Sequence, residues 1–151
     1  MVDRWCSDRK DVILILHLKC PGAKVKIAPQ WLKVAMEKLI SNALKATPSG
    51  GQLTITTQLA GDIVHITVKD TGKGIPDFAR PDFLKRTIRR PTINKTSGTG
   101  MGALIARFVA LNHGGDLIWA NRDQPCKGTE LLMTLPVTIG DETESPGDGG
   151  K

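Results

Sequence analysis

Residues 52–76 read QLTITTQLAGDIVHITVKDTGKGIP, and this stretch decides the fold. Gln52–Leu59 and Asp62–Asp70 both alternate between apolar and polar residues and are rich in β-branched side chains, and Ala60-Gly61 separates them. Such a pattern predicts a β-hairpin. The second strand leads directly into Asp70-Thr71-Gly72-Lys73-Gly74, so a carboxyl group and two glycines are expected where that strand ends.

A helix is expected on each side of this hairpin along the chain. Gln30–Ala46 carries apolar residues at steps of three and four, which form a broad apolar stripe, and this helix ends at Thr47-Pro48-Ser49-Gly50-Gly51. A second helix opens at Gly98-Thr99-Gly100-Met101-Gly102 and continues to about Asn112, where His113-Gly114-Gly115 ends it. The stripes predict that one side of each helix is buried.

Further strands complete the predicted sheet. Asp11–Lys19 is an apolar run that predicts a buried strand, and Lys24–Ile27 can add a short one. After the second helix, Asp116–Asn121 and Thr129–Pro136 predict a second hairpin. The order strand, helix, hairpin, long loop, helix, hairpin predicts an α+β fold, a two-layer α/β sandwich with a mixed, mostly antiparallel sheet and helices on one face.

The chain is expected to form one domain with short flanking segments. Segment 1–10 is polar, residues 11–138 hold all the predicted elements, and 139–151 is acidic, glycine-rich and expected to be disordered. Residues 77–97 contain prolines, many basic residues and weak periodicity. This composition predicts a long loop that holds a short helix around Phe83.

The composition favours an anionic small molecule as ligand. The 151 residues carry a net charge of +6, and the basic residues are spread along the chain except for a concentration between Lys85 and Lys95. No nucleic-acid-binding motif accompanies them, so a phosphorylated small molecule is favoured over nucleic acid. No apolar run is long enough to cross a bilayer and the polar N-terminus is no signal peptide, so we expect no membrane contact and a cytoplasmic location.

Three motifs carry groups that can bind a ligand. The side chains of Asn42 and Lys45 project from one face of the first helix. An Asn oxygen can ligate a hard cation and a Lys can bind phosphate, but both residues are also common at the solvent-exposed edge of a helix. Asp70 can accept a hydrogen bond from an exocyclic amine such as that of adenine, although ordinary turns also favour Asp and Gly. The glycines of 98–102 offer backbone N–H groups to an anion, yet they match neither a Walker loop nor a Rossmann fingerprint.

In their order and spacing, these motifs resemble the N box and the two glycine boxes of the GHKL ATPase superfamily. This superfamily includes gyrase-type topoisomerases, heat-shock chaperones of the ninety-kilodalton class, mismatch-repair ATPases and histidine kinases. Residues 39–48, LISNALKATP, and 98–104, GTGMGAL, followed by LNHGG at 111–115, are most similar to the histidine-kinase versions. Phe83 resembles the phenylalanine of the kinase F box, and Gly128-Thr129-Glu130 resembles the last glycine box.

The resemblance covers about residues 10–137 and implies a Bergerat ATP-binding fold with a mobile ATP lid at about residues 77–100. It also implies the ligands, ATP and Mg²⁺, and the residues that hold them. Asn42 would ligate Mg²⁺, Lys45 would contact phosphate, and Asp70 would bind the adenine amine. Thr129 would help to bind the adenine through a water molecule. The other residues implied at the site are Gly72 and Gly74 near the adenine, and Lys95, Gly98, Thr99, Gly100, Met101 and Gly102 around the phosphates.

The implied activity is that of the catalytic domain of a two-component sensor histidine kinase. Such a domain transfers the γ-phosphoryl group of ATP to a histidine on a separate dimerisation domain, which in turn implies a response regulator as partner. His17, His65 and His113 lack the sequence context of an acceptor, so the dimerisation domain is expected outside this chain, with segment 1–10 at the boundary. We therefore assign no catalytic residue within the chain and expect little autokinase activity from it alone.

Lys38 departs from the family pattern. It stands four residues before Asn42, where superfamily members that hydrolyse ATP carry Glu and histidine kinases often carry Asn. Activation of water by a glutamate is therefore not expected. Two alternatives to the sensor kinase are a degenerate, non-catalytic domain that senses nucleotide and regulates a partner, and an anti-sigma-type serine kinase, which shares the glycine boxes but usually keeps the Glu before the Asn.

Overall fold

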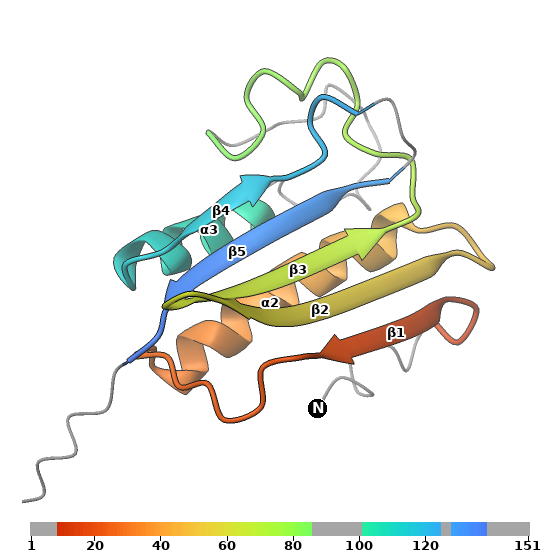
Figure 1. Cartoon of the computed structure of the whole chain (residues 1–151). Coiled ribbons are helices and arrows are strands. Elements are labelled where there is room, and N and C mark those ends of the chain that lie inside the picture. The colour runs from red at the N-terminus through yellow and green to blue at the C-terminus, as the bar shows by residue number, and fades with distance from the viewer. Residues whose placement is uncertain (1–8, 86–100, 125–127, 139–151) are drawn as a thin grey trace, which may run out of the picture.

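The computed structural model describes residues 9–85, 101–124 and 128–138, in which two helices cover one face of a five-stranded sheet (Figure 1). The strands lie in the order β1-β2-β3-β5-β4. The elements are β1 (Ile13–Leu18), α2 (Pro29–Ala46), β2 (Gln52–Ala60), β3 (Ile63–Asp70), α3 (Gly102–Asn112), β4 (Asp116–Trp119) and β5 (Glu130–Pro136). The predicted two-layer α+β sandwich is confirmed, and its sheet is mixed because β1 and β2 pair in parallel.

The hairpin of β2 and β3 forms the middle of the sheet. Its antiparallel register runs from Leu53 opposite Asp70 to Ala60 opposite Ile63, and Gly61 in the turn has a φ of 59°. Alternate residues are buried along β3 and, in β2, at Leu53 and Ile55, as the alternation of apolar and polar residues predicts. The register therefore places Asp70 at the far end of the hairpin, beside the start of β2.

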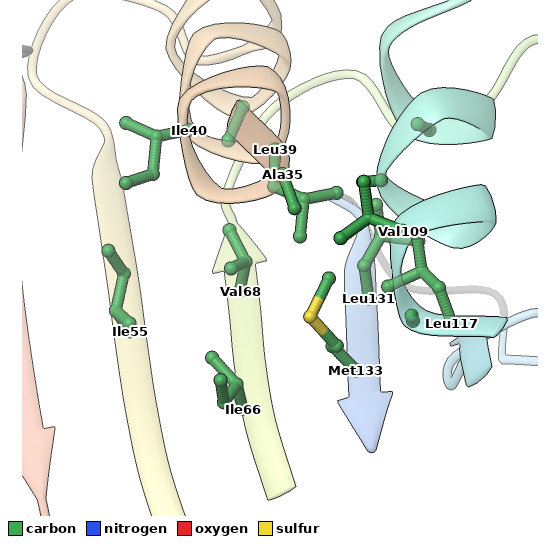
Figure 2. Close-up of a cluster of buried hydrophobic side chains, with 14 of the residues drawn as sticks. Ala35, Leu39, Ile40, Ile55, Ile66, Val68, Val109, Leu117, Leu131 and Met133 are labelled. Carbon is green, nitrogen blue, oxygen red and sulfur yellow. The ribbon is translucent and has the colours of Figure 1, made fainter. Parts of the chain in front are cut away.

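Both helices lay an apolar stripe on the same side of the sheet. Pro29 occupies the first turn of α2, where its missing N–H leaves no partner unsatisfied. In Figure 2, Ala35 and Leu39 of α2 face Val68 and Met133 of the sheet. The largest fully buried side chains are Leu39, Ile40, Leu53, Leu117, Met133 and Leu135. Among the described residues, neither helix has the length and apolar character needed to cross a membrane.

Strand β1 lies at the edge of the sheet, and the prediction of a buried strand there is wrong. Among the described strands its only neighbour is β2, and Ile13 and Leu18 are 53% and 68% exposed. An apolar run cannot by itself distinguish a central strand from an edge strand, because the difference depends on pairing partners distant in sequence. The predicted strand at Lys24–Ile27 reduces to one isolated bridge, between Val25 and Val137.

The short helix predicted around Phe83 is also absent from the structure. Residues 77–85 form consecutive turns instead, with Phe83 N–H donating to Ala79 and Lys85 N–H donating to Asp82. Leu84 has a φ of 65°, which a helix does not allow, and its side chain is nevertheless buried. The remainder of the predicted lid, residues 86–100, and the tail predicted to be disordered, 139–151, lie outside the described residues.

Replacing Leu39 with alanine should lower the free energy of unfolding by about 2–5 kcal/mol, because the side chain is 1% exposed and its loss leaves a cavity. Leu18→Ala removes the same atoms from an exposed side chain and should change that free energy by less than about 0.5 kcal/mol. Urea denaturation of the two variants measures the difference. Equal losses would contradict the placement of the core between α2 and the sheet.

Candidate functional site

The end of β3, the end of α2 and the segment that leads into β5 meet at one end of the sheet. Asp70 ends β3, and its N–H donates to the carbonyl of Thr129, just before β5, at 2.9 Å. Figure 1 shows the chain after β3 and the chain after β4 at this same end. Gly72 packs against the carbonyl of Ala46, the last residue of α2. The ends of β3 and α2 and the approach to β5 are therefore in contact.

The carboxyl group of Asp70 is held firmly but only through one of its oxygens. Asp70 is 5% exposed, and its Oδ1 accepts hydrogen bonds from the N–H of Gly72 at 2.8 Å and of Thr129 at 3.3 Å. Burial raises the pKa of Asp70, while these two backbone hydrogen bonds act in the opposite direction. Within the described residues, Oδ2 has no hydrogen bond, so it can accept one from a ligand.

Glycine is required at the positions where the backbone around Asp70 approaches most closely. A Cβ atom at Gly72 would overlap the carbonyl of Ala46, and one at Gly128 would overlap the carbonyl of Asp70. Gly74 and Gly128 have φ angles of 74° and 99°, in the region that favours glycine. The site therefore has walls of bare backbone, which suits a flat ligand.

Asn42 lies beside the first residue of α3. A Cβ atom at Gly102 would lie 3.0 Å from Nδ2 and 3.1 Å from Oδ1 of Asn42. Met101, which precedes α3, is an exposed residue that makes no side-chain capping bond, and the first turn holds no acidic residue. The first N–H groups of a helix have no partner within the helix and carry partial positive charge. An anion placed beside Asn42 at the start of α3 would meet these groups.

The structure therefore joins some predicted site residues and leaves others apart. Asp70, Gly72 and Thr129 share hydrogen bonds, Gly74 lies near Gly128, and Asn42 lies against Gly102. Lys45 is exposed on the last turn of α2, three residues after Asn42. Lys95, Gly98, Thr99 and Gly100 lie outside the described residues.

Sequence reasoning missed Asn121, which supports the site from behind. This side chain is buried, and its Oδ1 accepts hydrogen bonds from Trp119 Nε1 at 2.8 Å and from the N–H of Glu130 at 2.9 Å. Its Nδ2 donates to the carbonyl of Gly128 at 3.3 Å. Asn121 thus fixes both sides of Thr129, the residue that binds Asp70. An Asn at the end of the predicted apolar strand was the available signal, but it also fits an ordinary turn.

A second group of missed contacts fastens the turns of residues 77–85 to the sheet. The ring of Phe83 meets that of Trp119 edge-on at 5.4 Å, and the guanidinium of Arg80 lies 4.9 Å from the Trp119 ring. Arg107 of α3 donates to Asp116 at 2.8 Å and to the carbonyl of Leu84 at 2.8 Å. Residues 77–85, which lead into the predicted lid, are therefore fixed against β4 and α3.

This arrangement can bind a ligand that has a hydrogen-bond donor at one end and negative charge at the other. Oδ2 of Asp70 would accept the donor, and the α3 terminus with Asn42 would meet the anion. The described residues contain no group of three or more His, Cys, Asp or Glu side chains that could hold a metal ion by themselves. A cation beside Asn42 would therefore need ligands from the bound molecule and from water, as Mg²⁺ in phosphate sites does.

Asp70→Asn should raise the thermal midpoint of the ligand-free protein near pH 7. The asparagine keeps an oxygen for both N–H donors and removes a buried charge. Because burial raises the pKa of Asp70, the folded carboxyl binds a proton more tightly than the unfolded one, and the charged form costs stability at neutral pH. The advantage of the variant should fade as the pH falls through the raised pKa of folded Asp70, and it should be gone below the ordinary carboxyl pKa of about 3.9.

Asp116→Asn is the matched control for this pH dependence. The hydrogen bond from Arg107 lowers the pKa of Asp116, so this carboxylate adds stability above its ordinary pKa that is lost in acid. The control should therefore melt below the wild type near pH 7, and the difference should shrink in acid. Thermal melts across this pH range test both variants. A change of the same sign in both would contradict the environment assigned to Asp70.

Comparison with known proteins agrees with this geometry. Residues 27–139 match the family described as histidine kinase-, DNA gyrase B-, and HSP90-like ATPase. The sensor histidine kinase WalK of Bacillus subtilis is 33% identical over 141 residues, which are 90% of this chain and 23% of WalK. The sensor protein IrlS of Burkholderia pseudomallei is 42% identical over 111 residues, which are 72% of this chain and 23% of IrlS. The chain thus spans about a quarter of the length of these relatives.

Solved structures show the same fold. The mycobacterial sensor histidine kinase MprB superimposes with a TM-score of 0.74 at 24% identity, covering 90% of each chain. The resemblance that rested on the N box and the glycine boxes is confirmed by the family match, which covers the helix with Asn42, the strand end with Asp70 and the approach to β5. The chain belongs to the family of histidine kinase-, DNA gyrase B-, and HSP90-like ATPases.

Proposed function

We propose that this chain is the ATP-binding catalytic domain of a sensor histidine kinase and transfers the γ-phosphoryl group of ATP·Mg²⁺ to a histidine on a separate dimerisation domain. The observation that carries the proposal is the half-bound carboxylate of Asp70, whose free oxygen lies at the same end of the fold as the Asn42–Gly102 contact. The adenine base of ATP carries a hydrogen-bond donor that suits the free oxygen of Asp70. The phosphates of ATP carry negative charge that suits the start of α3 beside Asn42. The sensor kinases among the relatives support the reaction class.

Each part of the nucleotide has a candidate partner. Asp70 Oδ2 would accept the adenine amine, with Gly72, Gly74 and Gly128 forming the walls beside the base. Thr129 would help through water. The start of α3 and Lys45 would bind phosphate, and the Asn42 oxygen would ligate Mg²⁺. Lys95, Gly98, Thr99, Gly100 and Met101 complete the proposed phosphate site.

The residues of this chain would bind and orient ATP, and the acceptor domain would supply the nucleophile. In the transfer, a new bond joins a ring nitrogen of the acceptor histidine to the γ-phosphorus, and the bond from that phosphorus to the ADP oxygen breaks. The proton of the imidazole must leave to a group on the acceptor domain or to water. Bound Mg²⁺ would supply positive charge for the phosphate oxygens. Fixed hydrogen-bond donors lower the barrier because they need no reorganisation when charge shifts.

The same proposal implies the partners and the cellular location of the domain. The parent would carry the acceptor histidine and work with a response regulator, and this domain would act in the cytoplasm without nucleic acid or membrane contact of its own. Two alternatives remain as outcomes of the test below: a nucleotide-sensing domain without transfer, and a serine kinase of the anti-sigma type. Lys38 in place of an acidic residue argues against a site that activates an acceptor hydroxyl from α2.

The decisive experiment mixes the chain with ATP, Mg²⁺ and the separately produced acceptor domain of its parent. Acid-labile phosphate on a histidine of that domain is the expected product. Binding of ATP without any transfer would instead favour the sensor alternative, and acid-stable phosphoserine on a partner would favour the serine kinase. Omitting Mg²⁺ serves as the control, because transfer should stop.

Asp70→Asn should weaken ATP binding by roughly tenfold or more. In the variant, the N–H groups of Gly72 and Thr129 would take the asparagine oxygen as their acceptor. The Nδ2 group would then face the adenine amine, and because both groups are donors, no hydrogen bond could form between them. Calorimetric titration with ATP and Mg²⁺ measures the change, and the thermal midpoint verifies that the variant is folded. An unchanged affinity would remove the adenine assignment.

Asn42→Asp should alter how ATP binding depends on Mg²⁺. A carboxylate attracts the cation more strongly than an amide does, but it repels the phosphates when the cation is absent. The variant should therefore bind ATP more weakly than wild type in a chelator and regain affinity as Mg²⁺ is added. Adenosine, which carries no phosphate, should bind both proteins alike. Identical Mg²⁺ titrations would exclude Asn42 as a metal ligand.

A further inference from the structure

Helix α2 presents a line of three polar side chains on its exposed face: Lys38, Asn42 and Lys45. At 3.6 residues per turn, the three fall within an arc of about 60°. All three are exposed, and neither lysine forms an ion pair within the described part of the chain. By contrast Lys33, about 140° around the helix from Lys38, lies 4.0 Å from Glu37.

The direction of α2 sets the order of these side chains along the proposed nucleotide. Gly72 packs against the carbonyl of Ala46, so the Asp70 end of the site lies at the C-terminal end of the helix. Asn42 lies one turn closer to the N-terminus, beside Gly102. Lys38 follows about 6 Å further along the axis, on the side away from Asp70. A molecule that extends from Asp70 past Asn42 therefore continues toward Lys38.

Lys38 adds positive charge at the distal end of this line. The start of α3 contributes partial positive charge beside Asn42, and Lys45 lies on the Asp70 side of Asn42. The side chain of a lysine is a flexible point charge that suits phosphate oxygens. Negative charge on a ligand is thus matched at three successive positions, of which Lys38 is the furthest from Asp70.

We propose that Lys38 binds the terminal phosphate of the nucleoside triphosphate and makes the site favour ATP over ADP. The inference rests on the proposed function, because it assumes adenine at Asp70 and phosphates beside Asn42. ADP ends before the position of Lys38, and AMP ends earlier still. Lys38 therefore acts as a residue that determines specificity for the number of phosphates.

The test compares ATP, ADP and AMP binding to wild type, Lys38→Gln and Lys33→Gln by calorimetry in Mg²⁺. Lys38→Gln should weaken ATP binding by roughly three- to tenfold and change ADP and AMP binding less than about twofold. Lys33→Gln removes the same charge from another side of the helix and should leave the ratio of ATP to ADP affinity unchanged. Raising the salt concentration should weaken ATP binding to wild type more steeply than to Lys38→Gln.

The outcomes separate this inference from the proposed function. Wild type that binds none of the three nucleotides would overturn the proposed function itself. Wild type that binds ATP, with equal losses for ATP and ADP in Lys38→Gln, would overturn only the role of Lys38 at the terminal phosphate. Equal effects of Lys38→Gln and Lys33→Gln would likewise show that net charge alone is responsible. Lys38 is exposed, so unchanged thermal midpoints are expected and verify that both variants are folded.

Discussion

The hydrogen bonding between Asp70 and Thr129 is the constraint on which the rest of the site depends. It joins the end of β3 to the approach of β5, and it uses both the backbone N–H and one carboxyl oxygen of Asp70. Gly128 must be a glycine for the two segments to come this close, and Asn121 holds its carbonyl from the other side. The carboxylate is thereby buried and oriented before any ligand arrives. Such preorganisation reduces the ordering cost of binding.

Much of the fold could be predicted from the sequence because its central elements have local signals. The alternation in β2 and β3 and the apolar stripes of α2 and α3 gave these elements nearly their observed bounds. The edge position of β1 and the turns around Phe83 had no such signal, since they depend on pairing with β2 and on packing against Trp119. At the site, Asp70 and Asn42 were predictable from their motifs. Asn121 was not predictable, because its hydrogen bonds with Gly128 and Glu130 form only when β4 and β5 pair.

In the proposed kinase, this chain would bind the nucleotide and another domain would supply the nucleophile. This chain belongs to an ATPase family and spans about a quarter of the length of WalK and IrlS. Its proposed site binds and orients a nucleotide, whereas the nucleophile would come from another domain. The line of Lys38, Asn42 and Lys45 fits this view, because it offers charge and a cation ligand to the phosphates rather than an acidic group for water.

Binding of ATP at the end of the fold where Asp70, Thr129 and Asn42 lie is tested most directly by NMR of the isotopically labelled chain. On titration with ATP and Mg²⁺, the largest shifts should occur in the backbone amides of Gly72, Thr129 and Gly102. Signals from the groove lined by Val25–Ala28, His113 and Pro136, at the other end of the sheet, should stay in place. Shifts concentrated in that groove, with Gly72 and Thr129 unchanged, would contradict the account.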